Sequence, residues 1–159
     1  MIIKNLEVRW AKILGDPVPK YEPTDGNEWT VDFILTDEQV AEMENAGVTT
    51  AKYIREKNGD NIWTYRRSEL KRNGDPAKRI EVIAADGMAW PQSKLIGNGS
   101  IVDVKYGINE INDRKGQRFK PSAITILVRE HVPYESKGDG EEFDIDPEGT
   151  KVVENWDEE

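Results

Sequence analysis

Aromatic and basic side chains alternate in one short stretch, Ile62-Trp63-Thr64-Tyr65-Arg66-Arg67. Neighbouring side chains of a strand point to opposite faces, so Trp63, Tyr65 and Arg67 would share one face. Exposed rings stack on nucleobases at about 1–3 kcal/mol per base without sequence preference, and guanidinium groups hold phosphates. The stretch therefore predicts a surface for single-stranded nucleic acid. The alternative is an ordinary strand whose rings face the core.

Basic residues also gather in two polar segments, 71–79 and 112–118, whose Gly and Asn residues are typical of loops. Such clusters can follow a phosphate backbone, although basic loops also simply keep a protein soluble. The predicted nucleic-acid contacts are Trp63, Tyr65, Arg66, Arg67, Lys71, Arg72, Lys78, Arg79, Lys94, Lys105, Arg114, Lys115, Arg118 and Lys120.

A different chemistry is open to Asp86, Asp103 and Lys105. An Asp-x-Lys pair on a strand, with an acidic residue upstream, is half of a metal-dependent nuclease site, in which carboxylates hold Mg²⁺ and the lysine stabilises developing charge. Alternating charge on an exposed strand face produces the same pattern without catalysis. We expect no catalytic residue, no metal and no cofactor, and we keep the Mg²⁺-dependent nuclease as an alternative.

The composition excludes several classes of site. With no cysteine and one histidine among 159 residues, disulfides, thiol nucleophiles and Cys/His zinc sites are ruled out. No apolar run approaches the roughly 20 residues that span a bilayer, and no secretory signal is visible. The sequence therefore predicts a cytoplasmic protein without a membrane partner.

The net charge of −9 is unevenly distributed. Residues 1–134 contain 20 Lys and Arg and 20 Asp and Glu, whereas residues 135–159 contain 2 and 11, so the whole imbalance lies in the last segment. That segment shows no hydrophobic periodicity and is too polar to offset its ordering entropy. We expect a folded domain over residues 1–134 and a disordered acidic tail over residues 135–159.

Period-two patterns predict a mainly β domain. In the first strand, Leu6, Val8 and Trp10 would face inward. Thr36-x-x-Gln39 predicts the capped start of a helix that ends at Gly47, and one or two further helical turns would reach Lys57. The expected strands are 2–10, 29–35, 62–67, 80–84, 101–106 and 122–128.

The turn Gly97-Asn98-Gly99 precedes the most regular strand, and together they resemble a known protein family. Ile96-Gly-x-Gly-Ser100 running into Val104-Lys105-Tyr106 resembles the replicative single-stranded DNA-binding proteins of short-tailed (podovirus) bacteriophages. Trp29 to Phe33 ahead of a helix falls in the same order as in that family. The resemblance implies an OB-fold, a five-stranded Greek-key barrel, here with one inserted α-helix. It also implies a homodimer in the cytoplasm of the bacterial host.

The resemblance further implies that the acidic tail docks on the phage DNA polymerase and helicase-primase. The chain departs from the family by ending Trp156-Asp157-Glu158-Glu159 rather than in an aromatic residue, and by having Glu110 to Asp113 where stacking aromatics would lie. The predicted partner-binding residues of the tail are Phe143, Trp156, Asp157, Glu158 and Glu159.

The expected function is sequence-independent binding that coats and protects single-stranded DNA in phage replication and recombination. A second alternative is a non-enzymatic structural or adaptor β-domain of a virion.

Overall fold

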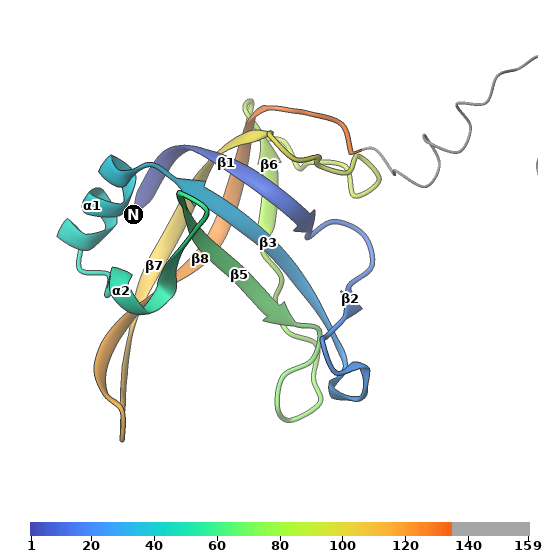
Figure 1. The fold of residues 1–159 in the computed structure, drawn as a ribbon. Coiled ribbons are helices and arrows are strands. Elements are labelled where there is room, and N and C mark those ends of the chain that lie inside the picture. The colour runs from blue at the N-terminus through green and yellow to red at the C-terminus, as the bar shows by residue number, and fades with distance from the viewer. Residues whose placement is uncertain (135–159) are drawn as a thin grey trace, which may run out of the picture.

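The computed structural model describes residues 1–134, in which a strongly bent sheet carries two short helices at one end (Figure 1). The predicted disordered tail, with Phe143, Trp156, Asp157, Glu158 and Glu159, lies outside the described residues. The elements are β1 (Ile2–Lys12), β2 (Val18–Pro19), the 3-10 turn η1 (Pro23–Asp25), β3 (Asn27–Leu35), α1 (Asp37–Asn45), α2 (Thr50–Tyr53), β4 (Ile54–Lys57), β5 (Asp60–Ser68), β6 (Glu81–Ala84), β7 (Ile101–Asp113) and β8 (Gly116–Glu130).

The strand order confirms the predicted fold class. The order is β4-β5-β3-β1-β7-β8-β6, with β2 added to β3. The four strands β7-β1-β3-β5 therefore form a Greek key, because the fourth long strand returns to lie beside the first. With β8 next to β7, these are the five strands of an OB-fold barrel. Within residues 1–134, β5 and β8 do not pair, so hydrogen bonds leave the barrel open on that side.

The core follows the predicted alternation over most of the sheet. Trp29, Val31, Phe33 and Leu35 of β3 are all buried, as are Val102, Val104 and Tyr106 of β7. The helix prediction is also confirmed, because the Thr36 hydroxyl accepts the Gln39 N–H and the Gln39 side chain accepts the Thr36 N–H. Helix α1 covers one end of the barrel through the buried Met43.

Three predictions about local structure were wrong. The segment 112–118 is mostly strand rather than loop, because β7 runs to Asp113 and β8 begins at Gly116. Trp10 does not face inward, since β1 contains a bulge between Arg9 and Lys12 and Trp10 has a φ of 53°. The expected helical turns up to Lys57 stop at Tyr53, and β4 forms a tight hairpin with β5 around Asn58-Gly59. Both residues of that turn have positive φ, the conformation that an Asn-Gly hairpin requires.

The Gly97 turn fastens the chain where it leaves β8. The Gly97 N–H donates to the Val132 carbonyl (2.7 Å), and the buried Ser100 hydroxyl accepts the Val132 N–H (2.8 Å). A Cβ at residue 97 would lie 2.5 Å from the Pro133 carbonyl oxygen. Only glycine therefore permits this close approach of the two backbones.

Strands β7 and β8 continue beyond the barrel as a two-stranded ribbon (Figure 1). Among the described residues, β1 pairs with β7 only as far as Lys105, so the outer part of the ribbon has no third strand. Thr49, just before α2, braces it: the Phe119 carbonyl accepts the Thr49 N–H (3.0 Å), and the Thr49 hydroxyl accepts the Phe119 N–H (2.9 Å). In the part of the chain that the structure describes, no helix is long and apolar enough to cross a membrane.

Candidate nucleic-acid interface

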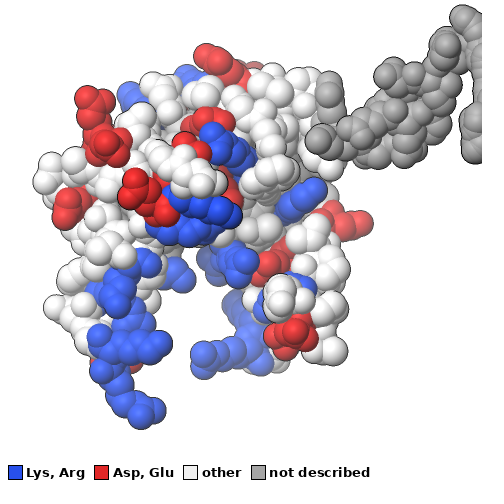
Figure 2. Space-filling model, in the orientation of Figure 1, with Lys and Arg blue, Asp and Glu red and all other residues white. Residues whose placement is uncertain are grey.

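A groove of about 1070 Å³ lies between β5 with its following loop and the β7–β8 ribbon. Figure 2 shows it as an open notch with blue Lys and Arg side chains on both sides. The groove extends onto the outer face of β3 and β5. The groove is lined by Trp10, Thr30, Asp32, Tyr53, Arg55, Trp63, Thr64, Tyr65, Arg66, Arg67, Ser68, Leu70, Lys71, Arg72, Ala77, Asn109, Ile111, Lys120, Pro121, Ser122 and Ala123.

The charge of this lining is strongly one-sided. Among residues 1–134, Asp32 is the one carboxylate in the lining, and neighbouring groups compensate its charge. Thr64 donates to the Asp32 carboxylate (2.7 Å), and Arg55 lies 3.8 Å from it and donates to Thr64 (2.9 Å). The cations of the lining are Arg55, Arg66, Arg67, Lys71, Arg72 and Lys120. Six cations against one compensated carboxylate make the groove a site for a polyanion.

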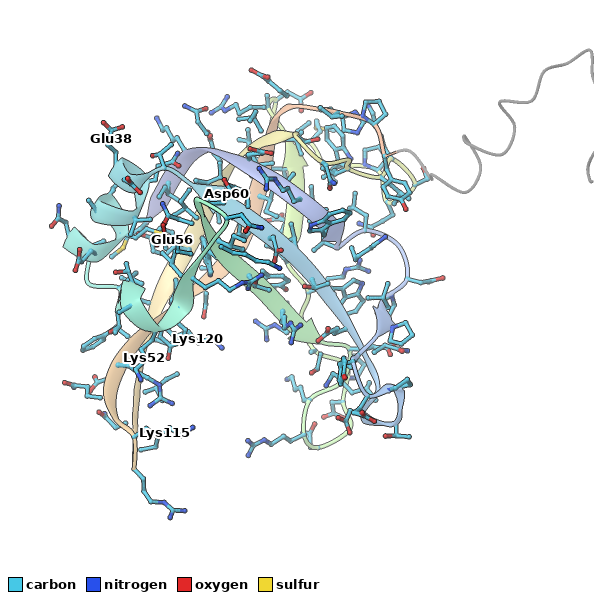
Figure 3. All side chains as sticks on the ribbon, in the orientation of Figure 1. Glu38, Lys52, Glu56, Asp60, Lys115 and Lys120 are labelled. Atoms are coloured by element: carbon cyan, nitrogen blue, oxygen red, sulfur yellow. The ribbon has the colours of Figure 1, made fainter. Side chains whose placement is uncertain are left out.

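The cations come from both sides of the groove. Arg66 and Arg67 lie at the end of β5, and Lys71 and Arg72 lie in the loop that follows it. Lys120 lies on the opposite ribbon, where Figure 3 shows it nearer the barrel than Lys115. Arg66 has a long contact of 4.0 Å with Glu28 and remains mostly exposed. These five predicted contacts therefore lie in one continuous groove.

The prediction that Trp63 and Tyr65 stack on bases was wrong. Their side chains are 3% and 6% exposed, because β5 turns this face into the core. The Trp63 ring packs against Phe33 and Tyr106 at centroid distances of 5.0 and 5.8 Å. The Tyr65 hydroxyl accepts the Ile80 N–H (3.2 Å), and burial raises its pKa. Both residues contribute to the groove lining, but too little of each ring is exposed for a base to stack on it.

Arg79 is a structural residue rather than a free phosphate ligand. Its guanidinium stacks 4.1 Å from the Trp29 ring centroid and donates to the carbonyls of Ile13 (2.6 Å) and Gly15 (3.0 Å). Burial lowers its pKa. The prediction for Arg79 was therefore wrong, because the charge fixes the connection after β1 to β3.

Arg118 is also occupied within the protein. Its two terminal nitrogens hold the Asp113 carboxylate at 2.8 and 2.9 Å, and its Nε donates to the Tyr53 hydroxyl (3.1 Å). The bidentate pair lowers the pKa of Asp113 to about 2. Arg118 thus joins the ribbon to α2 and is not available to a phosphate as predicted.

The remaining predicted contacts do not line the groove. Arg114 and Lys115 are exposed at the tip of the ribbon. Lys94 lies over the Trp90 ring at 4.8 Å, and Lys105 lies on the outside of β7 opposite Ile2. Lys78 is exposed but is absent from the lining. Exposed charge therefore does not by itself identify the groove.

The nuclease alternative fails on geometry. Both oxygens of Asp103 are engaged, one by the Asn5 N–H (3.0 Å) and the other by Arg129 (2.8 Å). Asp86 caps its own turn by accepting the Met88 N–H (3.0 Å). Within residues 1–134, no three His, Cys, Asp or Glu side chains are grouped to hold a metal ion.

Among the cationic and aromatic residues of the groove lining, three were not predicted from the sequence. Arg55 was assigned to a helix, although Asn58-Gly59 is the strongest short signal for a hairpin and so for a strand before it. A period of two predicts that Trp10 points inward. Val8 and Ile13 are both buried, although residues an odd number of positions apart in a regular strand point to opposite faces, so the alternation must shift between them, as it does at a β-bulge. For Tyr53, the sequence offers no signal beyond its place on a short helix.

The fold is that of phage single-stranded DNA-binding proteins. The single-stranded DNA-binding protein of bacteriophage Enc34, as a C-terminal truncation, superposes with a TM-score of 0.58 at 11% identity over 84% of this chain and 87% of that chain. The same Enc34 protein in complex with single-stranded DNA gives 0.58 at 11% identity over 84% and 88%. The single-stranded DNA-binding protein gp2.5 encoded by bacteriophage T7 gives 0.59 at 15% identity over 87% and 94%. No protein-family model and no curated protein matches the sequence.

Proposed function

We propose that this protein binds single-stranded DNA without sequence preference and coats it during replication and recombination of a phage genome. The observation that carries the proposal is the groove, whose lining holds six Lys and Arg against one compensated carboxylate. In OB-folds the second and third barrel strands and the loop between the fourth and fifth bind oligonucleotides, and here these are β3, β5 and the β7–β8 ribbon.

Lack of sequence preference follows from the kind of contact that the groove offers. Lys and Arg side chains bind phosphates, which carry no sequence information. The likeness to the Enc34 protein in complex with single-stranded DNA supports the same choice of ligand. In this proposal the groove binds the DNA without cleaving it, and the protein acts only by covering the strand.

The test is a fluorescence anisotropy titration of labelled oligo-dT, a mixed-sequence oligonucleotide and a duplex. We expect similar affinities for the two single strands, weaker binding to the duplex, and an affinity that falls with salt at about −0.7 in log–log slope per neutralised phosphate. No saturable binding at low salt would overturn the proposal, as would a salt-independent affinity.

We further propose that residues 135–159 recruit the phage DNA polymerase and helicase-primase, and that the protein acts as a homodimer in the cytoplasm of the bacterial host. The support is the resemblance of the sequence and the concentration of the −9 charge in this segment, beside aromatic residues such as Phe143 and Trp156. Neutralising Asp157, Glu158 and Glu159 in the full chain should abolish polymerase capture, with DNA binding retained. Analytical ultracentrifugation should give twice the monomer mass of 18.1 kDa.

A further inference from the structure

We propose that Trp10 is the ring on which a DNA base stacks, and that Asn98 holds it in position. This inference rests on the proposed function, because it assigns one contact within the same groove. It also replaces the role that the sequence assigned to Trp63 and Tyr65.

Trp10 is the exposed indole of the described chain. Its side chain is 64% exposed and lines the groove, whereas Trp29, Trp63 and Trp90 are buried. A tryptophan side chain can bury roughly 150–250 Å² and dominates the energetics of a core or an interface. Because the Trp10 ring stays in water, its apolar surface does not stabilise the fold. A base stacked on the ring would bury that surface and gain the same kind of free energy.

The backbone of β1 is bent so that this ring points outward. The φ of Trp10 is 53°, and a bulky residue with positive φ is an outlier that needs support from its surroundings. The β1–β3 register shifts between Arg9 and Lys12, and such a bulge re-aims a side chain. Without it, the alternation that buries Leu6 and Val8 would turn the indole into the core.

The glycine turn holds the bulge. The side-chain oxygen of Asn98 accepts the Trp10 N–H at 2.8 Å. Directly after Asn98, the Gly99 N–H donates to the Val8 carbonyl (2.9 Å), and the Ser100 carbonyl accepts the Val8 N–H (2.9 Å). The turn is thereby fastened to β1 two residues before Trp10, and Asn98 is placed to bind the bulged peptide.

The surroundings of Trp10 fit a nucleotide. Thr30 of β3 lies opposite Lys12 of β1 on one side and Arg66 of β5 on the other. Arg66 is therefore two strand spacings from β1, about 10 Å, and its long side chain can reach a phosphate whose base lies on Trp10. The nearby Asp32 carboxylate is already compensated by Arg55.

The test compares Trp10→Ala with Tyr21→Ala, a matched loss of an aromatic ring that is 94% exposed outside the groove lining. Trp10→Ala should weaken oligo-dT binding by about 5- to 150-fold with an unchanged salt slope, because it removes a stacked base and no cation. The loss should disappear on an oligonucleotide of abasic sites. Trp10→Phe should retain most of the affinity and lose most of the tryptophan quenching that DNA binding produces.

The role of Asn98 is tested by a double-mutant cycle. Asn98→Ala should weaken oligo-dT binding in the wild-type chain and have no effect in the Trp10→Ala chain, since a positioning residue acts only through the ring that it positions. An equal effect in both backgrounds would refute the positioning role. Binding by Trp10→Ala equal to that of Tyr21→Ala would refute the stacking role and leave the proposed function standing. The proposed function itself would be removed by failure of the wild-type chain to bind oligo-dT, or by a wild-type affinity that does not depend on salt.

Discussion

Replacing Lys71 and Arg72 by glutamine tests whether the groove holds the DNA backbone. Both residues lie in the loop after β5 and line the groove, and neither forms an ion pair within residues 1–134. The substitutions keep a polar, hydrogen-bonding side chain at each position and remove two positive charges. Since both residues are exposed, we expect stability to be unchanged within about 0.5 kcal/mol.

The expected magnitude follows from the charges in the lining. Four groove cations lack an ion pair within residues 1–134, while Arg55 and Arg66 contact Asp32 and Glu28. At about −0.7 per phosphate, four to six cations give a wild-type slope of about −2.8 to −4.2, and the double variant should be less steep by about 1.4. Raising salt from about 50 to about 200 mM should weaken wild-type binding about 50- to 300-fold and the variant about 7- to 50-fold.

The assay is the oligo-dT titration at several salt concentrations, and the matched control is Lys94→Gln with Lys105→Gln. These two lysines were predicted from the sequence as contacts but lie outside the groove. The control removes the same net charge, so it should lower the affinity slightly and leave the slope unchanged. A slope lowered equally by both pairs would refute the assignment of the groove, since binding would then depend on net charge alone.

Three further predictions concern stability. Trp63→Ala should lower the free energy of unfolding by about 3–5 kcal/mol in urea titration, because the ring lies in the core, and the salt slope of DNA binding should stay unchanged. Gly97→Ala should lower the urea midpoint markedly, because its new Cβ would meet a backbone oxygen at 2.5 Å, whereas Gly107→Ala, with its nearest neighbour at 3.7 Å, should change it little. In an NMR titration the Asp113 carboxylate should titrate with a pKa of about 2, and Arg118→Gln should return it towards about 3.9. Because the folded pKa is lowered, the contribution of this pair to stability is complete above about pH 4 and is lost as the pH falls through about 2.

The β framework was predictable because burial on one face imposes a period of two. Trp29, Val31, Phe33 and Leu35 occur at every second position, and the structure buries all four. The capped start of α1 was predictable for a similar reason, since the hydrogen bonds between Thr36 and Gln39 are local. In both cases the determining contacts lie within a few residues of one another in the sequence.

The groove was only partly predictable, because it depends on contacts between distant segments. Trp63 and Arg67 share a face of β5. Trp63 is nevertheless buried against Phe33 and Tyr106, whereas Arg67 is exposed near the end of the strand. No pattern within residues 62–67 separates them. Arg79 and Arg118 read as free charges in the sequence, and only the fold brings Trp29 and Asp113 to them.

The groove is open to solvent between the loop after β5 and the β7–β8 ribbon (Figure 2), and this has a topological consequence for any polymer that lies in it. A trough that is open along its side receives a strand laterally, and no free end has to be threaded through a closed ring. A covalently closed circle should therefore be as good a ligand as a linear oligomer of equal length. If the protein coats single-stranded DNA as proposed, the same opening would let neighbouring molecules load in any order along one template.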